Sequence, residues 1–403
     1  MTDVPATGDL AGTPAPAATT CAVCGGETGA PFLSIADQPV HCNVLHDTAR
    51  GATSAPRGDL DLVFCPTCGH VRNVSFDEAL TTYGGTYENS LHHSATFQGY
   101  ATELVESLVE RHGLRDADVV EIGAGQGDFL GMLCAAGANR GTGFDPSHVG
   151  DDDEVGGVRV VPAFYDERFA DHPADLIVCR HVLEHIGASG EFVAMVRRVV
   201  GDRSTAAFFE VPNALWTLED GGIWDLIYEH CGYFTPTSLG EVFRRASFRV
   251  ERIDSVFGGQ FLTVEAAPAD DVPPAPADLA ERVEALSASV ERFATTHAEA
   301  VERWDGVLGE LRAAGRRAVI WGAGSKGVTF LNTVASDGVV DRAVDINPRK
   351  LGMHVAGSGQ PIVAPEALAD DPPDAVLIMN PNYRGEIEAS LADLGVRADV
   401  HVV

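Results

Sequence analysis

The sequence predicts an α/β fold with two open-sheet domains behind a small cysteine-rich module. Short apolar runs alternate with helical stretches in two separate regions, which is the pattern of parallel sheets joined by crossover helices. A glycine-rich turn follows the first apolar run of each region. Two Cys-x-x-Cys pairs precede both regions and predict the module.

The charge balance limits the partners that this chain can have. Its 403 residues include 28 Lys and Arg against 59 Asp and Glu, a formal net charge of −31 at pH 7. Such a field repels nucleic-acid phosphates and anionic lipids, so we expect neither nucleic acid nor a membrane as partner. No apolar run has the roughly 18 residues of a membrane span. The N-terminal segment lacks the basic and apolar regions of a secretory signal, which predicts a cytoplasmic protein.

Residues 1–19 are rich in Ala, Pro and Thr and are predicted to be a disordered tail. Residues 20–80 are predicted to bind zinc, because paired Cys-x-x-Cys turns supply four thiolates. The predicted ligands are Cys21, Cys24, Cys65 and Cys68. Disulfides or a redox pair are the alternatives, but no secretion signal or βαβ context accompanies these cysteines. Four thiolates leave no open position, so we expect a structural ion.

The core domain is expected over residues 81–265. A helical pattern at 94–113 precedes four apolar runs, the first of which is Val119–Ile122. The glycines that follow this run let the backbone approach a ligand closely. They are Gly123, Gly125 and Gly127. Glu121 lies just ahead of the turn, and the next run ends in Asp145, where a carboxylate can accept both hydroxyls of a ribose. An ordinary NAD site is the alternative at this point.

A polar segment follows the fifth predicted strand of the core. Tyr228, Glu229, His230 and Tyr233 place two phenol rings, a carboxylate and an imidazole within six positions. A histidine beside a carboxylate in a sheet-edge loop can act as a proton acceptor near neutral pH. Solvent-facing positions are the alternative for such a pair, but the flanking aromatic rings favour a partly enclosed pocket.

A second domain is expected after a linker. Residues 266–277 are rich in Pro, Ala and Asp, and a long helical pattern follows, so 266–315 is predicted to join the domains. Residues 316–403 begin with a strand and Gly322-Ala-Gly-Ser-Lys-Gly327, which matches GxGxxG. Lys326 in this loop, together with a helix N-terminus, favours an anion. The alternative is a lid that binds no ligand.

Taken together, these features resemble the sugar C-methyltransferases of deoxysugar biosynthesis in antibiotic-producing bacteria. The likeness covers nearly everything after residue 20. It consists of a zinc module, a class I methyltransferase core, the segment Tyr228-Glu-His-x-x-Tyr-Phe234, Gly258-Gly-Gln260 and a C-terminal Rossmann-like domain. The domain order together with Tyr-Glu-His is specific, whereas the glycine loops alone are not.

The resemblance implies S-adenosylmethionine as cofactor beside the structural zinc. It places the cofactor between the first glycine turn and residues on neighbouring strands and loops. The implied cofactor-binding residues are Tyr87, Glu121, Gly123, Gly125, Gly127, Asp145, Phe164, Arg180 and His181.

The implied substrate is a nucleotide-linked 4-keto-6-deoxyhexose, a small molecule whose ketone acidifies the neighbouring C3 hydrogen. His230 would remove this hydrogen, Glu229 would fix the histidine's tautomer, and the enolate carbon would attack the cofactor's methyl group. Tyr228 and His181 complete the expected catalytic set. The implied acceptor-binding residues are Tyr87, Asn213, Tyr233, Gln260, Gly324, Lys326, Lys350 and Tyr383.

Three positions of the expected acceptor pocket depart from the family pattern, namely Asn89, Ile227 and Gln260. They leave open another ketose, or a compound that is not a sugar. Three wider alternatives also remain. The first is an O- or N-methyltransferase on another natural-product scaffold. The second is a non-catalytic binding platform, and the third is an NAD-dependent oxidoreductase.

Overall fold

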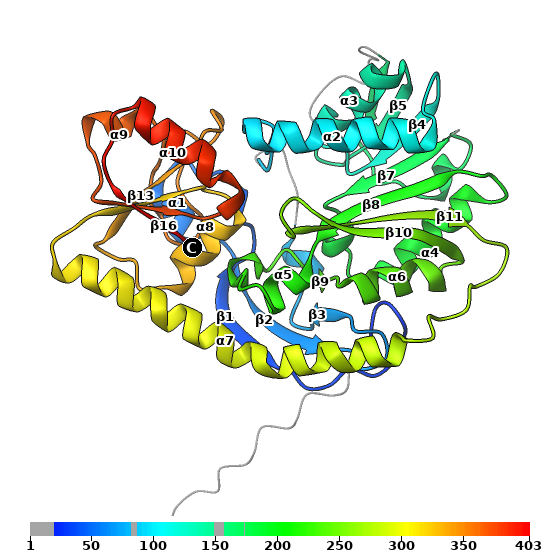
Figure 1. The fold of residues 1–403 in the computed structure, drawn as a ribbon, viewed down its shortest axis with the longest axis horizontal. Coiled ribbons are helices and arrows are strands. Elements are labelled where there is room, and N and C mark those ends of the chain that lie inside the picture. Colours follow the sequence, from blue (N-terminus) through cyan, green and yellow to red (C-terminus); the bar gives the residue numbers. More distant parts are fainter. Residues whose placement is uncertain (1–19, 82–86, 149–156, 173) are drawn as a thin grey trace, which may run out of the picture.

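The protein is known from a computed structural model, which describes residues 20–81, 87–148, 157–172 and 174–403. The expected tail over 1–19 lies outside the described residues. Within them, the chain forms a four-stranded, a seven-stranded and a five-stranded sheet. The predicted α/β class, with two open sheets behind a four-cysteine module, is confirmed (Figure 1).

The N-terminal sheet draws its strands from two distant parts of the sequence. Its order is β1-β2-β3-β9. The strands are β1 (Leu33–Pro39), β2 (Arg57–Phe64), β3 (Val71–Asn73) and β9 (Gly232–Tyr233). Val71 of β3 pairs with Tyr233 of β9, which directly follows the Tyr-Glu-His segment. The N-terminal module and the core domain are therefore joined by backbone hydrogen bonds.

The seven-stranded sheet forms the core domain, in the order β10-β11-β8-β7-β4-β5-β6. Its strands are β4 (Asp118–Ile122), β5 (Arg140–Phe144), β6 (Val158–Val161), β7 (Leu176–Arg180), β8 (Ala206–Pro212), β10 (Phe248–Val256) and β11 (Phe261–Pro268). The strands from β6 to β8 are parallel, whereas β11 runs antiparallel to both β8 and β10. The four apolar runs of the sequence correspond to β4, β5, β7 and β8.

Helices of the core domain begin and end where the sequence supplies caps. Helix α2 (Ala95–His112) begins after Ser94, whose hydroxyl accepts a hydrogen bond from the Phe97 amide. It ends at Gly113, which adopts the left-handed conformation. The other helices of this domain are α3 (Asp128–Gly137), α4 (Ser189–Val200), α5 (Ala214–Leu218) and α6 (Pro236–Arg245), with short 3-10 turns η2 (Glu167–Phe169), η3 (Leu183–His185) and η4 (Ile223–Asp225).

The C-terminal sheet is fully parallel, in the order β14-β13-β12-β15-β16. Its strands are β12 (Ala318–Trp321), β13 (Val340–Val344), β14 (Ile362–Val363), β15 (Ala375–Ile378) and β16 (Asp399–Val402). The helices are α8 (Ser325–Thr333), α9 (Ala367–Asp370) and α10 (Arg384–Asp393), with η5 (Pro381–Tyr383) between β15 and α10.

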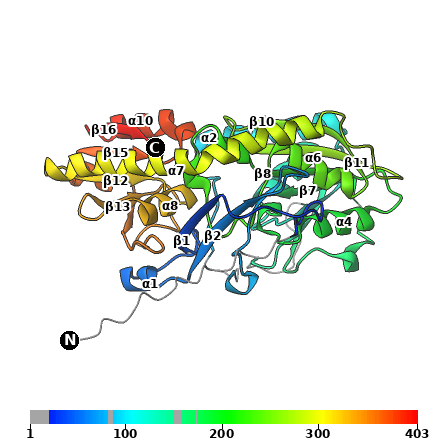
Figure 2. The ribbon, with the colours of Figure 1, turned by 90° about the horizontal axis from the view of Figure 1, so that it is seen from below.

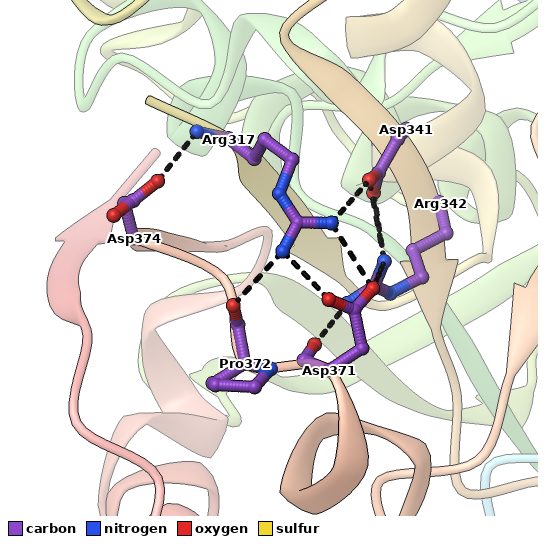
Figure 3. Close-up of polar contacts among 6 residues, drawn as sticks. All are labelled: Arg317, Asp341, Arg342, Asp371, Pro372 and Asp374. Atoms are coloured by element: carbon purple, nitrogen blue, oxygen red, sulfur yellow. Dashed lines mark hydrogen bonds and ion pairs between the residues drawn. The ribbon is translucent and has the colours of Figure 1, made fainter. Parts of the chain in front are cut away.

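An ion-pair network lies at the N-terminal ends of these parallel strands, at the opposite edge from the glycine loop. The Arg317 guanidinium contacts both oxygens of Asp371, at 3.0 Å and 2.7 Å (Figure 3). Arg342 reaches the same carboxylate at 2.8 Å. Because these groups lie away from the loop, we assign the network a structural role.

Helix α7 (Leu279–Ala313) extends from the core domain to the C-terminal domain (Figures 1 and 2). Its apolar side is buried at both ends, with Leu286 near the N-terminal module and Trp304 against Phe330 of α8. One hydrophobic cluster contains residues of the N-terminal sheet, of α7 and of the C-terminal domain. The long helical pattern therefore forms one helix that packs against both the N-terminal module and the C-terminal domain. The expected linker starts later than the sequence suggested, because residues 266–268 are part of β11.

The remaining helices are α1 (Ala49–Thr53) and the 3-10 turn η1 (Glu78–Leu80) in the N-terminal module. Among the helices of the described residues, none is long and apolar enough to cross a bilayer.

Candidate active site

The four cysteines of the N-terminal module converge on one point. Their sulfur atoms all lie within 4.8 Å of one another. The sulfurs of Cys21 and Cys68 are 3.6 Å apart, and those of Cys24 and Cys65 are 3.5 Å apart. Four thiolates at about 2.3 Å from a tetrahedral zinc would stand roughly 3.8 Å apart, so the geometry fits this ion.

The turns around the cysteines also suit a metal site. The amide of Val23 points to the sulfur of Cys21, and the amide of Gly26 to that of Cys24, both at 3.4 Å. Gly25 adopts a φ of 71°, which favours glycine. Amides directed at sulfur stabilise thiolates, which are the form that binds zinc.

The first glycine turn adopts a conformation that side chains would prevent. Gly123, Gly125 and Gly127 have φ values of 73°, 56° and 84°. A Cβ on Gly123 would lie 2.2 Å from a methyl carbon of Val182. The turn therefore needs glycine for both its dihedral angles and its close packing. Because glycine has no side chain, the backbone at the start of α3 is accessible to a ligand.

The two predicted acidic residues lie on either side of this turn. Asp145, at the end of β5, accepts hydrogen bonds from the amides of Gly125 and Ser147, both at 2.8 Å. Glu121 is 3% exposed, and its Oε2 has no hydrogen-bond partner among the described residues. Burial raises the pKa of Glu121 to about 8.

Phe164 lies beyond β6 and is 71% exposed, although most large apolar side chains here are buried. The neighbouring Tyr165 packs instead against Phe144 in the core, with ring centroids 5.0 Å apart. An exposed ring at this sheet edge is available to cover a flat ligand.

A charged cluster joins β7 and β8 beside the turn. Arg180 donates to Glu210 at 2.9 Å, and His181 Nε2 lies 2.7 Å from the same carboxylate oxygen. His181 Nδ1 faces Glu184 at 3.6 Å. Burial lowers the pKa of His181, but the two carboxylates outweigh it and raise the value to about 9. His181 is therefore cationic at neutral pH, and it has a left-handed φ of 53°.

The Tyr-Glu-His segment divides its side chains between two environments. The Tyr228 ring is buried, and its hydroxyl accepts a hydrogen bond from the Asp77 amide at 2.8 Å. The Glu229 carboxylate contacts His41 Nδ1 at 3.1 Å and accepts from the Cys42 amide at 2.9 Å. Neither residue lines the cavity described below. Both side chains anchor the loop to the N-terminal module, whereas His230 points elsewhere.

A cavity of about 390 Å³ lies between the core and the C-terminal domain. His230 lines it, together with His181 and His185. Burial lowers the pKa of His230 well below its usual range, and the charges of His185, His181 and Lys326 act in the same direction. His230 is therefore neutral at physiological pH and able to accept a proton.

The C-terminal domain contributes the opposite wall through its own glycine loop and strand ends. Lys326, Lys350 and Tyr383 line the cavity, as does Gly324. Both lysines already face carboxylates of the protein. Lys326 Nζ lies 2.6 Å from Asp225 of the core domain, and Lys350 Nζ lies 3.7 Å from Asp345.

The other predicted acceptor residues are placed as follows. Tyr87 and Gln260 line the cavity, and Gln260 exchanges two hydrogen bonds with Asn380 of the C-terminal domain, at 2.8 Å and 2.9 Å. Asn213 caps α5 and bonds to the Gly259 carbonyl, and Tyr233 donates to the Ile227 carbonyl. Neither of these two residues lines the cavity.

Several residues of the site had no signal in the sequence. Glu210 lies within β8 and Glu184 lies in the turn η3, and the fold buries both beside His181. Asp225 and Asn380 reach across to the opposite domain. The sequence offers one signal for Glu210. Its carboxylate lies within an otherwise apolar strand, where a charge is unusual.

Two family models match separate parts of the chain. Residues 95–253 match a methyltransferase domain, and residues 279–400 match a C-methyltransferase C-terminal domain. Comparison with curated proteins finds no match.

Two solved structures are among those that are similar to part of this chain. The 1,6-didemethyltoxoflavin-N1-methyltransferase of Burkholderia thailandensis, solved with S-adenosylhomocysteine, is 18% identical; the match covers 44% of this chain and 82% of that one, with a TM-score of 0.33. The magnesium protoporphyrin IX methyltransferase of Synechocystis PCC 6803, also solved with S-adenosylhomocysteine, is 18% identical over 43% of this chain and 84% of that one, with a TM-score of 0.32.

The two matched domains identify the chain as an S-adenosylmethionine-dependent methyltransferase. The C-terminal match defines it more narrowly as a C-methyltransferase, an enzyme that transfers the cofactor's methyl group to carbon. The predicted enzyme class and cofactor are thereby confirmed, and the NAD-dependent and non-catalytic alternatives are set aside.

Proposed function

We propose that this enzyme methylates a small molecule, the C3 carbon of a nucleotide-linked 4-keto-6-deoxyhexose, with His230 as the base. The observation that carries this proposal is the position of His230: a neutral imidazole on the wall of a cavity that both domains line. A ketone beside the reacting carbon makes its hydrogen acidic enough for such a base.

The reaction requires deprotonation and alignment. His230 would take the proton from C3, and the C–H electrons would form the enolate. The enolate carbon would attack the methyl group, the sulfur–methyl bond would break, and S-adenosylhomocysteine would leave. S-adenosylmethionine supplies the electrophilic methyl. The protein's part is to hold the acceptor in line and to exclude water, as the two-domain cavity allows.

We further propose roles for the residues around the cofactor. The bare glycine turn and Asp145 would hold the methionine and ribose parts, and Phe164 would cover the adenine. Arg180 and Glu121 would support the cofactor site. Tyr228 and Glu229 would position the loop that carries His230. The last two roles follow from their contacts with the N-terminal module.

We assign the diphosphate of the acceptor to the second glycine loop, beside Lys326, Lys350, Tyr383 and Gly324. Asp225 forms an ion pair with Lys326 in this structure. A bound acceptor diphosphate would therefore take the place of the Asp225 carboxylate beside Lys326. We also propose that the four cysteines hold one structural zinc ion, since their sulfurs fit its tetrahedral geometry.

The test is methyl transfer from labelled S-adenosylmethionine to a nucleoside-diphosphate 4-keto-6-deoxyhexose. We expect the labelled methyl on the sugar carbon, which carbon NMR distinguishes from a methyl on oxygen or nitrogen, whereas O-methyl or N-methyl products would support the alternative scaffold methyltransferase. His230→Gln should lower kcat by about 10²–10⁴-fold because it removes the base. Cofactor affinity should stay within about twofold. An unchanged kcat would remove His230 from the mechanism.

A further inference from the structure

The glycine loop of the C-terminal domain has the same framework as the first glycine turn. The amide of Gly123 donates at 2.8 Å to the carbonyl of Phe144, the last residue of β5. In the same way, the amide of Gly322 donates at 2.8 Å to the carbonyl of Val344, the last residue of β13. The residue after each of these strands is an aspartate. The C-terminal loop therefore resembles the turn to which we assign the cofactor and its ribose.

Asp345, the aspartate after β13, is available to a ligand. Its Oδ2 accepts a hydrogen bond from the Ala323 amide at 3.0 Å, and its Oδ1 accepts one from the Asn347 amide at 2.9 Å. A carboxylate oxygen can accept two hydrogen bonds, so each oxygen can take a further donor. The side chain is 12% exposed and lines the cavity. A hydroxyl group bound in the cavity therefore has an acceptor here.

The charges around the loop favour different parts of a ligand. Lys326 Nζ faces Asp225 of the core domain at 2.6 Å, and its charge lowers the pKa of His230. This side of the loop therefore favours an anion close to the proposed base. Asp345 repels phosphate and favours hydroxyl donors. Lys350 Nζ, at 3.7 Å, offsets part of the Asp345 charge from beyond hydrogen-bond distance.

We propose that Asp345 accepts hydrogen bonds from the ribose of the acceptor's nucleoside, so that the enzyme prefers a ribonucleoside-diphosphate sugar to its 2′-deoxyribonucleoside counterpart. This inference rests on the proposed function, which leaves the nucleoside open. The reacting sugar lies beside His230, the diphosphate at the glycine loop and the ribose at Asp345. A carboxylate about 20 residues after a GxGxxG loop is placed to bind a ribose 2′-hydroxyl.

Ile346 provides a surface for the nucleobase. Its side chain is 38% exposed and lines the cavity directly after Asp345 in the chain. An apolar side chain at this position can pack against the flat face of a base. Because it has no hydrogen-bonding group, Ile346 does not distinguish one base from another. The hydroxyl groups of the ribose therefore offer the clearer test of selectivity at this end of the cavity.

Calorimetry on the full chain with bound S-adenosylhomocysteine tests this preference. The probes are the diphosphates of uridine, cytidine, adenosine, guanosine and 5-methyluridine, each compared with its 2′-deoxy form. A 2′-deoxyribose lacks one donor to the carboxylate. For the base that binds most tightly, we expect the ribose form to bind about 5- to 150-fold more tightly than the deoxyribose form.

Two substitutions assign the preference to one side chain. Asp345→Asn replaces charge-assisted hydrogen bonds with weaker neutral ones, so the ratio of the two dissociation constants should fall. Asp345→Ala removes the acceptor, so the ratio should approach one. General damage to the domain would weaken both forms alike and leave the ratio unchanged. Asp337→Asn, in the exposed turn before β13, removes a charge at the opposite end of this strand and should keep the wild-type ratio.

The outcomes separate this inference from the proposed function. If the wild type binds none of these diphosphates, the nucleotide-linked acceptor of the proposed function fails, and this inference fails with it. If diphosphates bind but the deoxyribose forms bind equally well or better, only this inference is overturned. A wild-type ratio in an Asp345→Ala variant that still binds S-adenosylhomocysteine normally would also overturn the role of Asp345.

Discussion

At the scale of single residues, the site separates the protonation states of two histidines that line one cavity. His181 lies between two carboxylates and is cationic, whereas His230 is neutral because of its burial and its neighbours. Environments that separate the pKa values of paired groups are typical of acid–base catalysis.

The charge of His181 makes its contribution to stability dependent on pH. Its pKa rises from 6.5 to about 9 on folding, so the stabilisation is complete below pH 6.5 and is lost as the pH rises through about 9. The full effect is about 3 kcal/mol at most. Urea unfolding should therefore show His181→Gln less stable than wild type at pH 6, with the difference shrinking by pH 10. A difference independent of pH would contradict the ion pair with Glu210.

Phe164 provides a test of the cofactor site. Stacking of a base on an aromatic ring is worth about 1–3 kcal/mol. Phe164→Ala should therefore weaken S-adenosylhomocysteine binding by about 5- to 150-fold in calorimetry, with little effect on the melting temperature, since the ring is 71% exposed. Leu80→Ala, another exposed apolar position, is the control. Equal affinity in the Phe164 variant would place the adenine elsewhere.

At the scale of secondary-structure elements, β9 links the four-cysteine module to the loop that carries His230. It begins at Gly232, two residues after His230, and pairs with β3, so the backbone of this loop continues the N-terminal sheet. The anchoring of Tyr228 and Glu229 strengthens this connection. We therefore expect the stability of the four-cysteine site to be coupled to the position of the proposed base His230.

Cys65→Ser tests this coupling. The variant should lose about one zinc ion per chain by mass spectrometry under native conditions, because three thiolates and a hydroxyl bind zinc far more weakly. The melting temperature should fall by on the order of 10 °C, since structural zinc contributes several kcal/mol. Activity should fall with it. Cys134→Ala, at a buried cysteine outside the cluster, should keep the metal. Full activity in a zinc-free enzyme would refute the coupling.

At the scale of the whole molecule, two domains are held together around the cavity by contacts from distant residues. Gln260 and Asn380 exchange two hydrogen bonds, Glu386 accepts from Ser94 at 2.7 Å, and Asp225 pairs with Lys326. Helix α7 and the shared hydrophobic cluster connect the same domains from the other side. The cavity's shape therefore depends on the domain arrangement.

Asn380→Asp should disturb this arrangement, because it replaces the amide donor to Gln260 with an oxygen that repels its carbonyl. Loss of a buried hydrogen bond costs about 1–3 kcal/mol, so the acceptor KM should rise by about 5- to 150-fold. Binding of S-adenosylhomocysteine, which depends on the core domain, should stay the same in calorimetry. Asp393→Asn on the exposed side of α10 is the control. An equal loss of cofactor affinity would show that the variant damages the core.

The sequence by itself determined the elements and their chemistry. Helix α2 follows its caps, the strands follow their apolar runs, and the glycine turn and cysteine pairs follow local spacing. All of these depend on neighbours within a few residues. The tertiary structure decided the direction of each side chain in the Tyr-Glu-His segment. Tyr228 and Glu229 turn to the N-terminal module, His230 faces the cavity, and His185, 45 positions earlier, lies beside it. Contacts between residues so far apart depend on how whole domains pack, and no local pattern records them.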